Sequence, residues 1–419
     1  MLSVSRLASL IAVLYALITI GWAARIDDCC CDTETVDLAN QSDLHSLLEK
    51  IRATRFFKIF QLNLYNDCKF WKDESLCSSP RCSVCECTDE VPELWKTGDN
   101  LDMKLPEFEH WTEEDENWIV QDTGTMTFIN LQRNPESYTG YSGEPARKIW
   151  SAMYGENCFQ DRFSDMCYEK RVFFRLLSGL QACISAHVSY NHPLGDGQEW
   201  GPDPTVFNRM LGRHPERIQN IYFVFVFLLR AVNKMSDFFS LYDYRTGSEP
   251  NQIAEDNHTK TLMQNLLNAP MVLQCSPDHS FNENNMFRDI DSEYIKSQLR
   301  SHFRNLSLIM DCVHCDKCRV HGKLQILGIG TALKILFNDA KQLQRNEIIA
   351  LINTLGKFSH GIWITREMQR LSRLSWIRIS LVTIFTLVAI TVTCCMCLRL
   401  ITARMSPRNM MGPARVKTD

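Results

Sequence analysis

The sequence predicts a mainly α-helical domain with a disulfide-tied, cysteine-rich loop segment before it and a transmembrane helix near the C-terminus. Between residues 148 and 340, apolar side chains recur at helical spacing. That region contains no alternating runs flanked by hairpin signals and no repeat of solenoid period. Eight of the eighteen cysteines fall between residues 29 and 87. These three observations together predict one helical domain with a cross-linked N-terminal segment.

The two ends of the chain predict entry into the secretory pathway and a membrane anchor. Residues 1–24 have the pattern of a cleaved signal peptide, with an uncleaved signal anchor as the alternative. Residues 379–398 form an uncharged run of about twenty positions, which is enough to cross a bilayer. Residues 399–419 form a basic tail. We therefore expect a single-pass type I protein with residues 25–374 on the lumenal side.

The lumenal part divides by composition into three stretches. Residues 25–90 are rich in cysteine, residues 91–130 are acidic with little periodicity, and residues 131–366 are strongly helical. The acidic stretch predicts a surface loop of low order. Within the helical stretch, Ile221–Leu229 is apolar all round, so it is predicted to lie in a core. At about nine residues it is too short to span a membrane.

Charge and glycosylation signals agree with a lumenal protein. The formal net charge is −4, which gives no support for nucleic-acid binding. N-x-S/T sequons begin at Asn40, Asn257 and Asn305. We expect glycosylation at Asn257 and Asn305.

Three cysteines at equal spacing, Cys312, Cys315 and Cys318, precede a long helical pattern and allow three interpretations. They could bind zinc, form a structural bridge or act as a redox couple. Zinc is disfavoured because an oxidising lumen competes for thiolates, so no metal is expected here. Cys315 and Cys318 form a CxxC at a helix start beside Lys317, which predicts a lowered thiol pKa and exchange activity. Cys312 is left for a bridge to a distant partner.

A second candidate dithiol is Cys77 with Cys82, in the sequence CSSPRC. Its loop setting suits an exposed, reducible disulfide. Two dithiols suggest an electron relay that needs an acceptor. The later sequence GIGTAL lacks a preceding strand and the third glycine of a dinucleotide fingerprint. Close helix packing explains Gly328 and Gly330 better.

At this point the sequence resembles a known family, the endoplasmic reticulum oxidoreductins, which are FAD-dependent thiol oxidases. The resemblance covers roughly residues 29–366. It is carried by NPESYTGYSGEPARKIW, ENCF, EKRVFFRLLSGL, Arg217, Arg230, FRNLS and DCVHCDKCRVHGKLQILGIGTALKILF. It implies an enzyme of the endoplasmic reticulum that uses FAD and oxygen, forms hydrogen peroxide and accepts electrons from protein disulfide isomerase.

The resemblance also assigns roles to residues. Cys315 and Cys318 would be the active-site pair beside the flavin, and Cys77 and Cys82 would be the shuttle pair. Cys68 would pair with Cys312, and Cys158 with Cys167, as structural bridges. The residues expected to bind FAD are Thr139, Trp150, Ser178, Arg217 and Arg230. The two arginines are expected to pair with the pyrophosphate, and Trp150 to stack on a ring.

The chain departs from the family pattern at two positions. Ser137 stands where an arginine is usual, and Gln181 where a histidine is usual. Both changes remove expected FAD contacts. The alternatives are therefore a flavin-free disulfide exchanger and an inactive cysteine-rich binding ectodomain. The pairing of the remaining N-terminal cysteines stays open, namely Cys29, Cys30, Cys31, Cys85 and Cys87.

Overall fold

The computed structural model describes residues 33–72, 80–96, 117–158, 167–194, 199–274, 283–288, 291–338, 340 and 342–405. The predicted signal peptide and half of the acidic loop, residues 97–116, lie outside these residues. The chain divides into two compact units, Met1–Arg366 and Glu367–Asp419, which are described separately below.

The N-terminal part of the first unit is a chain of short helices that ends in a strand. The helices are α2 (Thr33–Ala39), η1 (Asn40–Leu44, a π-helical turn), α3 (His45–Ala53) and α4 (Arg55–Lys58). Strand β1 (Ile59–Leu62) pairs antiparallel with β2 (Thr127–Asn130), with Ile59 opposite Asn130. A second hairpin joins β3 (His192–Leu194) and β4 (Glu199–Gly201). Strands of three residues are too short to show alternation, so the sequence pattern did not reveal them.

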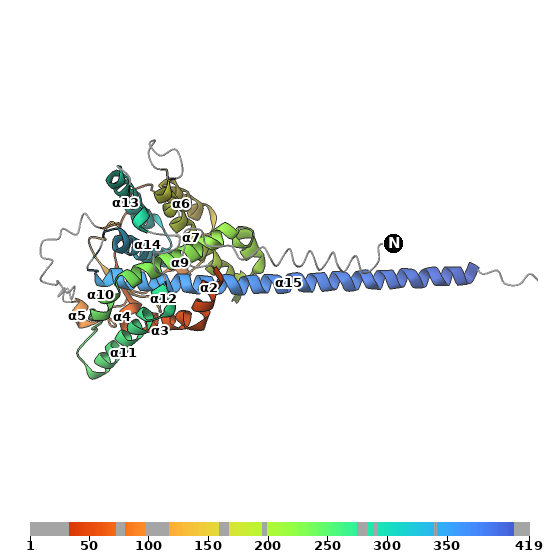
Figure 1. Ribbon diagram of the computed structural model, residues 1–419, viewed down its shortest axis with the longest axis horizontal. Helices are drawn as coiled ribbons and strands as arrows, with labels where there is room; N and C mark the ends of the chain where they lie inside the picture. Colours follow the sequence, from red (N-terminus) through yellow and green to blue (C-terminus); the bar gives the residue numbers. More distant parts are fainter. Residues whose placement is uncertain are drawn as a thin grey trace, which may run out of the picture. The chain divides into compact units, whose positions relative to one another are not determined.

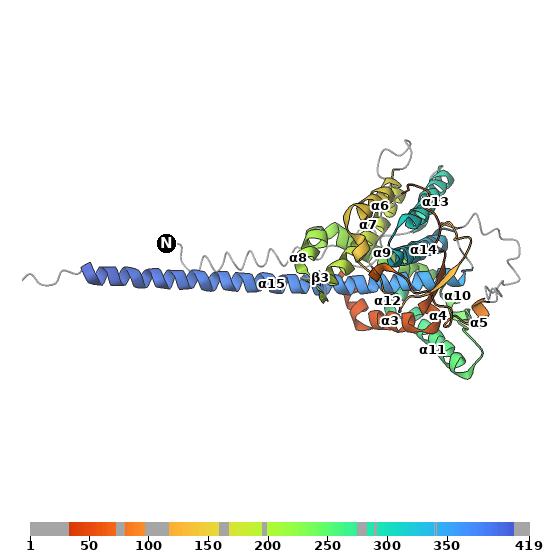
Figure 2. The ribbon, with the colours of Figure 1, turned by 180° about the vertical axis from the view of Figure 1, so that it is seen from behind.

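Long helices form the core, which confirms the mainly α-helical prediction. Helix α9 (Pro215–Lys234) packs against α7 (Tyr168–Tyr190) and α14 (Asp316–Asn338), as Figure 1 shows. The middle of α9 is buried on all sides, as its apolar sequence predicted. Seen from behind, α8 (Pro204–Phe207) lies against the same α7 (Figure 2). The other elements are η2 (Pro80–Cys82), α5 (Glu93–Lys96), η5 (Thr139–Tyr141), α6 (Gly143–Gly155), η6 (Asn208–Gly212), α10 (Ser236–Leu241), α11 (Pro250–Leu267), α12 (Pro270–Gln274), η7 (Glu283–Asn285), α13 (Ser292–Ile309), η8 (Met310–Cys312) and α15 (Arg345–Met405).

Close helix contacts explain the glycines of α14. A β-carbon on Gly328 would lie 2.6 Å from the carbonyl oxygen of Ala350 on α15. One on Gly330 would lie 2.3 Å from the Ile119 side chain. No ordinary carbon contact is this short. The packing interpretation of GIGTAL is therefore confirmed.

Two described helices are long and apolar enough to cross a membrane by length and composition alone. One is α7, whose most apolar window is 83% buried in the first unit, so it is a core helix. The other is α15, which in the second unit continues from Glu367 to Met405. Apolar side chains between residues 377 and 400 are exposed there.

Candidate redox site

The CxxC pair lies at the start of α14. Cys315 and Cys318 are both buried. The Arg319 amide donates to the Cys315 carbonyl at 2.7 Å, which closes the first helical turn around the pair. The Cys318 thiol donates to the Ser137 carbonyl at 3.1 Å. The pair is thus fixed between a helix N-terminus and the segment that carries Ser137.

Gly140 covers the two sulfur atoms with bare backbone. A β-carbon at this position would lie 2.7 Å from both the Cys315 β-carbon and the Cys318 sulfur. Any side chain here would collide with the dithiol. The glycine therefore sets how closely η5 can approach the pair.

Cys82 completes a group of three thiols. Its residue ends η2, which packs against α14, and its side chain is buried. The Cys82 thiol makes a hydrogen bond with the Cys315 thiol, and it lies 3.9 Å from the Ser137 hydroxyl. The second predicted shuttle cysteine, Cys77, lies outside the described residues.

Asn134 holds the segment that follows Cys82 in place. Its side-chain oxygen accepts from the Cys85 amide, and its side-chain nitrogen donates to the Cys85 carbonyl, both at 2.8 Å. The Cys87 amide donates to the Phe128 carbonyl of β2 at 2.9 Å. The thiol of Cys82 is therefore presented from a segment anchored on the β2 side.

The third cysteine of the motif has a different role. Cys312 and Cys68 form a disulfide bond with their Cα atoms 4.6 Å apart. Since Cys312 is consumed in this bond, it offers no thiolate to zinc. Cys158 and Cys167, expected to form a bridge, are not bonded to each other. Instead, the Cys167 sulfur accepts from the Lys170 amide at 3.5 Å and caps α7.

The thiol electrostatics differ from the prediction. A hydrogen bond with Cys318, burial and the neighbouring thiolate charge all raise the pKa of Cys315, against a smaller opposing contribution from Cys82. The expected lowering of the thiol pKa is therefore wrong for Cys315. The helix N-terminus and the charge of Lys317 would lower this pKa, but the hydrogen bond between the two adjacent sulfurs raises it by more.

A buried ion pair fixes both sides of Ser137. The Lys357 ammonium on α15 contacts the Glu136 carboxylate and donates to the Tyr138 hydroxyl at 3.0 Å. Burial opposes ionisation of Glu136, but the charge of Lys357 outweighs it and lowers the pKa to about 2. Burial raises the pKa of Tyr138 to about 12. Lys357 was not recognised from the sequence, because nothing local links it to a partner 221 positions away.

Trp150, one of the residues expected to bind FAD, lines a pocket of about 690 Å³. Trp150, Tyr154 and Gln181 line it, and Tyr141 forms the wall toward Cys318. The Tyr154 hydroxyl bonds with Gln181 at 2.7 Å and also contacts Ser178. The pocket is of a size usual for small-molecule sites.

Tyr154 was missed in the sequence, yet it lies where the predicted residues converge. Arg217 is near enough to lower its phenol pKa, although burial raises that pKa overall. Arg217 itself is exposed and donates to the Met210 carbonyl at 3.2 Å. The side chain of Thr139 lies outside the described residues, but its backbone begins η5 beside Gly140.

Arg230 does not join this group. It lies thirteen positions after Arg217 on one continuous helix, which separates their backbones by about 20 Å along the axis. It is 3% exposed and ion-paired with Glu283. The backbones of the two arginines therefore lie far apart along α9, and their pairing with one pyrophosphate stays a prediction.

The sequons differ in accessibility. Asn257 is exposed on α11, whereas the Asn305 amide donates to Glu156 at 2.9 Å and is partly buried. Asn40 is fully buried, so it is not accessible for glycosylation in the folded chain. Of the three asparagines, only Asn257 is thus exposed, while Asn40 and Asn305 are buried or partly buried.

Comparisons with known proteins agree on one family. The model of Endoplasmic Reticulum Oxidoreductin 1 (ERO1) matches residues 43–365. Endoplasmic reticulum oxidoreductin-1 of Arabidopsis thaliana is 39% identical over 377 residues, covering 82% of this chain and 79% of its own. ERO1-like protein alpha of Homo sapiens is 32% identical over 420 residues, and the match covers 80% of this chain and 88% of the human protein.

Solved structures give the same result. The chain matches Ero1p, described as a source of disulfide bonds for oxidative protein folding in the cell, with a TM-score of 0.64. The match has 26% sequence identity and covers 83% of this chain and 99% of that one. The chain therefore belongs to the endoplasmic reticulum oxidoreductin (ERO1) family, oxidoreductases of oxidative protein folding.

Proposed function

We propose that this protein is a thiol oxidase that reoxidises protein disulfide isomerase in the endoplasmic reticulum. Electrons would pass from the Cys77–Cys82 pair to the Cys315–Cys318 pair, then to FAD, and finally to oxygen, which becomes hydrogen peroxide. The observation that carries this proposal is the contact of the Cys82 thiol with Cys315. Two dithiols can exchange only when their sulfurs meet.

The exchange begins at the shuttle. Reduced isomerase converts the Cys77–Cys82 disulfide to two thiols and leaves as a disulfide. The Cys82 thiolate then attacks the Cys315 sulfur, since these two atoms are in contact, and the bond to Cys318 breaks. Attack by Cys77 on Cys82 restores the shuttle disulfide. The inner pair has then gained two electrons and two protons.

The local contacts assign separate tasks to the two inner thiols. Cys315 faces the shuttle, and its raised pKa keeps it protonated once it is released. Cys318 is the leaving group of the first attack, and it is held against the Ser137 carbonyl on the side of Tyr141. Lys357 supports this geometry by anchoring Glu136 and Tyr138 on either side of Ser137.

The residues around the 690 Å³ pocket fit FAD. Trp150 and Tyr154 offer flat faces, the Gln181 amide and the Ser178 hydroxyl offer hydrogen bonds, and Arg217 offers positive charge. Thr139 begins η5, whose Tyr141 lines the pocket, and Arg230 would meet a different part of the cofactor. Bound FAD would supply two-electron acceptance from thiols and reactivity with oxygen. Gln181 and Ser137 would make this binding differ in strength from that of typical relatives.

The sequence signals supply the location. We propose that residues 1–24 direct the chain into the endoplasmic reticulum and that residues 379–398 anchor it in the membrane as a type I protein. Family membership supports the compartment. The exposed apolar side chains of α15 support the anchor.

The visible absorption spectrum of the purified chain tests the proposal. We expect flavin bands near one equivalent per chain that bleach when reduced isomerase is added without oxygen. Cys82→Ala should keep the bands but lose the bleaching, whereas the exposed Cys158→Ala should keep both. A colourless, folded chain that still exchanges disulfides would replace the oxidase with a flavin-free exchanger. A chain without exchange would leave only a binding role.

A further inference from the structure

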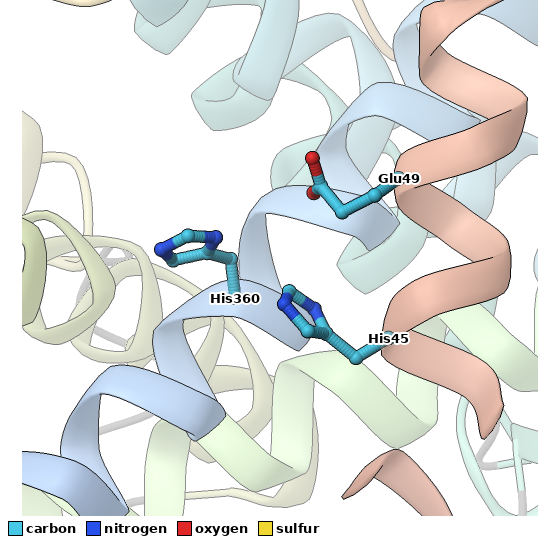
Figure 3. Close-up of side chains that lie close together, drawn as sticks. All are labelled: His45, Glu49 and His360. Atoms are coloured by element: carbon cyan, nitrogen blue, oxygen red, sulfur yellow. The ribbon is translucent and has the colours of Figure 1, made fainter. Parts of the chain in front are cut away.

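A second cluster of ligating side chains lies between α3 and α15, outside the redox site. His45 and Glu49 project from α3 toward His360 on α15 (Figure 3). One ligand atom from each residue can be chosen so that all three lie within 4.8 Å of one another. Among the residues that the structure describes, this is the one such group of histidine, cysteine or acidic side chains. We propose that His45, Glu49 and His360 form a binding site for a divalent transition metal ion of the zinc type.

The local sequence explains the arrangement. His45 and Glu49 are four positions apart, so they share one face of α3. The π-helical turn η1 directly precedes His45, and such turns often occur at functional sites. Two imidazoles and one carboxylate make a donor set used in open zinc sites, where a fourth position is left for water. Imidazole nitrogen favours zinc over the hard cations calcium and magnesium.

A hydrogen-bond chain selects the ligating tautomer of His45. The Asn40 amide nitrogen donates to the Ser359 carbonyl at 3.0 Å, so the Asn40 side-chain oxygen must be the group that accepts from the Ser359 hydroxyl at 2.6 Å. The Ser359 hydroxyl therefore uses its only proton in the hydrogen bond to Asn40. It can therefore only accept from His45 Nδ1, which lies 3.1 Å away. The proton on Nδ1 leaves Nε2 with a free lone pair for a metal.

The imidazole of His360 packs against three neighbouring aromatic rings. Its ring centroid lies 5.3 Å from that of His45, 5.2 Å from that of His187 and 5.5 Å from that of Trp363. These ring contacts fix the orientation of the His360 imidazole beside His45.

Charges and space around the cluster allow a cation to enter. Arg52 contacts Glu49 Oε1 at 2.6 Å, which leaves Oε2 for the metal. Lys357 is neutralised by Glu136. Glu49 and His360 both line a pocket of about 320 Å³, which provides an entry path and room for a water ligand. The ion would link α3 to α15, two helices that are neighbours in space but far apart in the sequence.

Zinc titration of the full chain tests the site. The chain is purified in detergent, its thiols are blocked with N-ethylmaleimide, and metal is stripped with a chelator. We expect one zinc equivalent per chain at equilibrium, and a thermal midpoint that rises with added zinc. His45→Ala, Glu49→Gln and His360→Ala should lose the equivalent and the shift. His258→Ala, an exposed histidine on α11, should keep both.

Two further readouts separate ligation from general effects. Ser359→Ala should weaken zinc binding by about 10- to 100-fold without abolishing it, because it removes only support for His45. Cobalt should give visible bands without thiolate charge transfer, since no sulfur is a ligand. If a variant misfolds, the wild-type chain still tests the site. Zinc should protect His45 and His360 from chemical modification by diethylpyrocarbonate. Absence of a bound equivalent in the wild-type chain, unchanged uptake in the folded variants or lack of protection would each overturn the site.

Discussion

Lys357 contacts the residues on both sides of Ser137 and so supports the geometry there. Its side chain is buried, and its ammonium contacts both Glu136 and Tyr138. Removing one partner of a buried pair leaves an uncompensated charge, which usually costs about 3–5 kcal/mol. Replacing both partners with neutral groups costs less.

We therefore expect Lys357→Met to lower the free energy of unfolding by about 3–5 kcal/mol. Glu136→Gln combined with Lys357→Met should recover part of that loss. Denaturant unfolding of both variants measures the difference. Lys296→Met, which removes a lysine from α13 outside this ion pair, is the matched control and should change little. Equal stability of wild type and Lys357→Met would contradict the buried pair.

The same pair predicts a pH dependence. Glu136 has a folded pKa of about 2 against an ordinary value of 4.5. Its contribution to stability is therefore present above pH 4.5 and is lost as the pH falls toward 2. Acid unfolding of the wild-type chain should show this loss, and the Glu136→Gln variant should show less of it. Parallel acid profiles for the two chains would rule out this contribution.

Gly140 predicts a purely steric effect on the dithiol. A methyl group there would collide with Cys315 and Cys318, so Gly140→Ala should displace η5 and slow reduction of the inner pair at least about tenfold. Gly155→Ala is the matched control, because nothing lies within 4 Å of its added carbon. Anaerobic reduction by dithiothreitol, followed by thiol alkylation, measures the effect. Normal reduction of the Gly140 variant would show that η5 adapts freely.

Single residues also show how far sequence could reach into the site. The spacing of Cys315 and Cys318 at a helix start is a local signal, and it is visible in the sequence. The approach of Cys82 to Cys315 is a long-range contact, and only the family resemblance supplied it. The sequence around Tyr154 and Lys357 does not predict a role in the site, because each is one aromatic or basic residue in a helical pattern. Their roles come from tertiary contacts with distant residues.

At the scale of elements, the Cys68–Cys312 disulfide joins the N-terminal segment to the turn just before α14. The bond closes a loop of 244 positions. Cross-links of long loops restrict the unfolded chain strongly, and removing a native one typically costs about 2–5 kcal/mol. The bond also fixes the turn that leads into the CxxC pair.

The double variant Cys68→Ser, Cys312→Ser should therefore lower stability by about 2–5 kcal/mol and slow transfer between the two dithiols. Thermal unfolding and isomerase oxidation measure the two effects. Cys158→Ser with Cys167→Ser provides the matched control, since those cysteines are not bonded here. A double variant as stable and active as wild type would show that the bond is dispensable.

Element geometry also explains where prediction failed. Helical periodicity located α7, α9 and α14 well, because each buries a face or its whole surface. The expected arginine clamp stays a prediction, and the continuous α9 adds only that the two arginines lie far apart along the helix, as the rise per residue implies. The short hairpins carry too few residues to produce a pattern of their own.

At the scale of the whole molecule, the apolar part of α15 predicts integral membrane attachment. We expect the full chain to stay with membranes after extraction with alkaline carbonate. A chain that ends at Arg366, the limit of the first compact unit, should be released. Release of the full chain would instead indicate a loosely bound hydrophobic tail.

The disulfide between Cys68 and Cys312 has a kinetic consequence for the proposed cycle. It holds the chain about 14 residues before Cys82, and at about 3.5 Å per residue that length cannot exceed about 50 Å. The shuttle segment between Cys68 and Cys82 would thus react with an outside partner while it stays close to the inner pair. Linkers of this kind give effective concentrations in the millimolar range. Electron delivery to the inner pair would then be first order, with a rate that does not change when the enzyme is diluted.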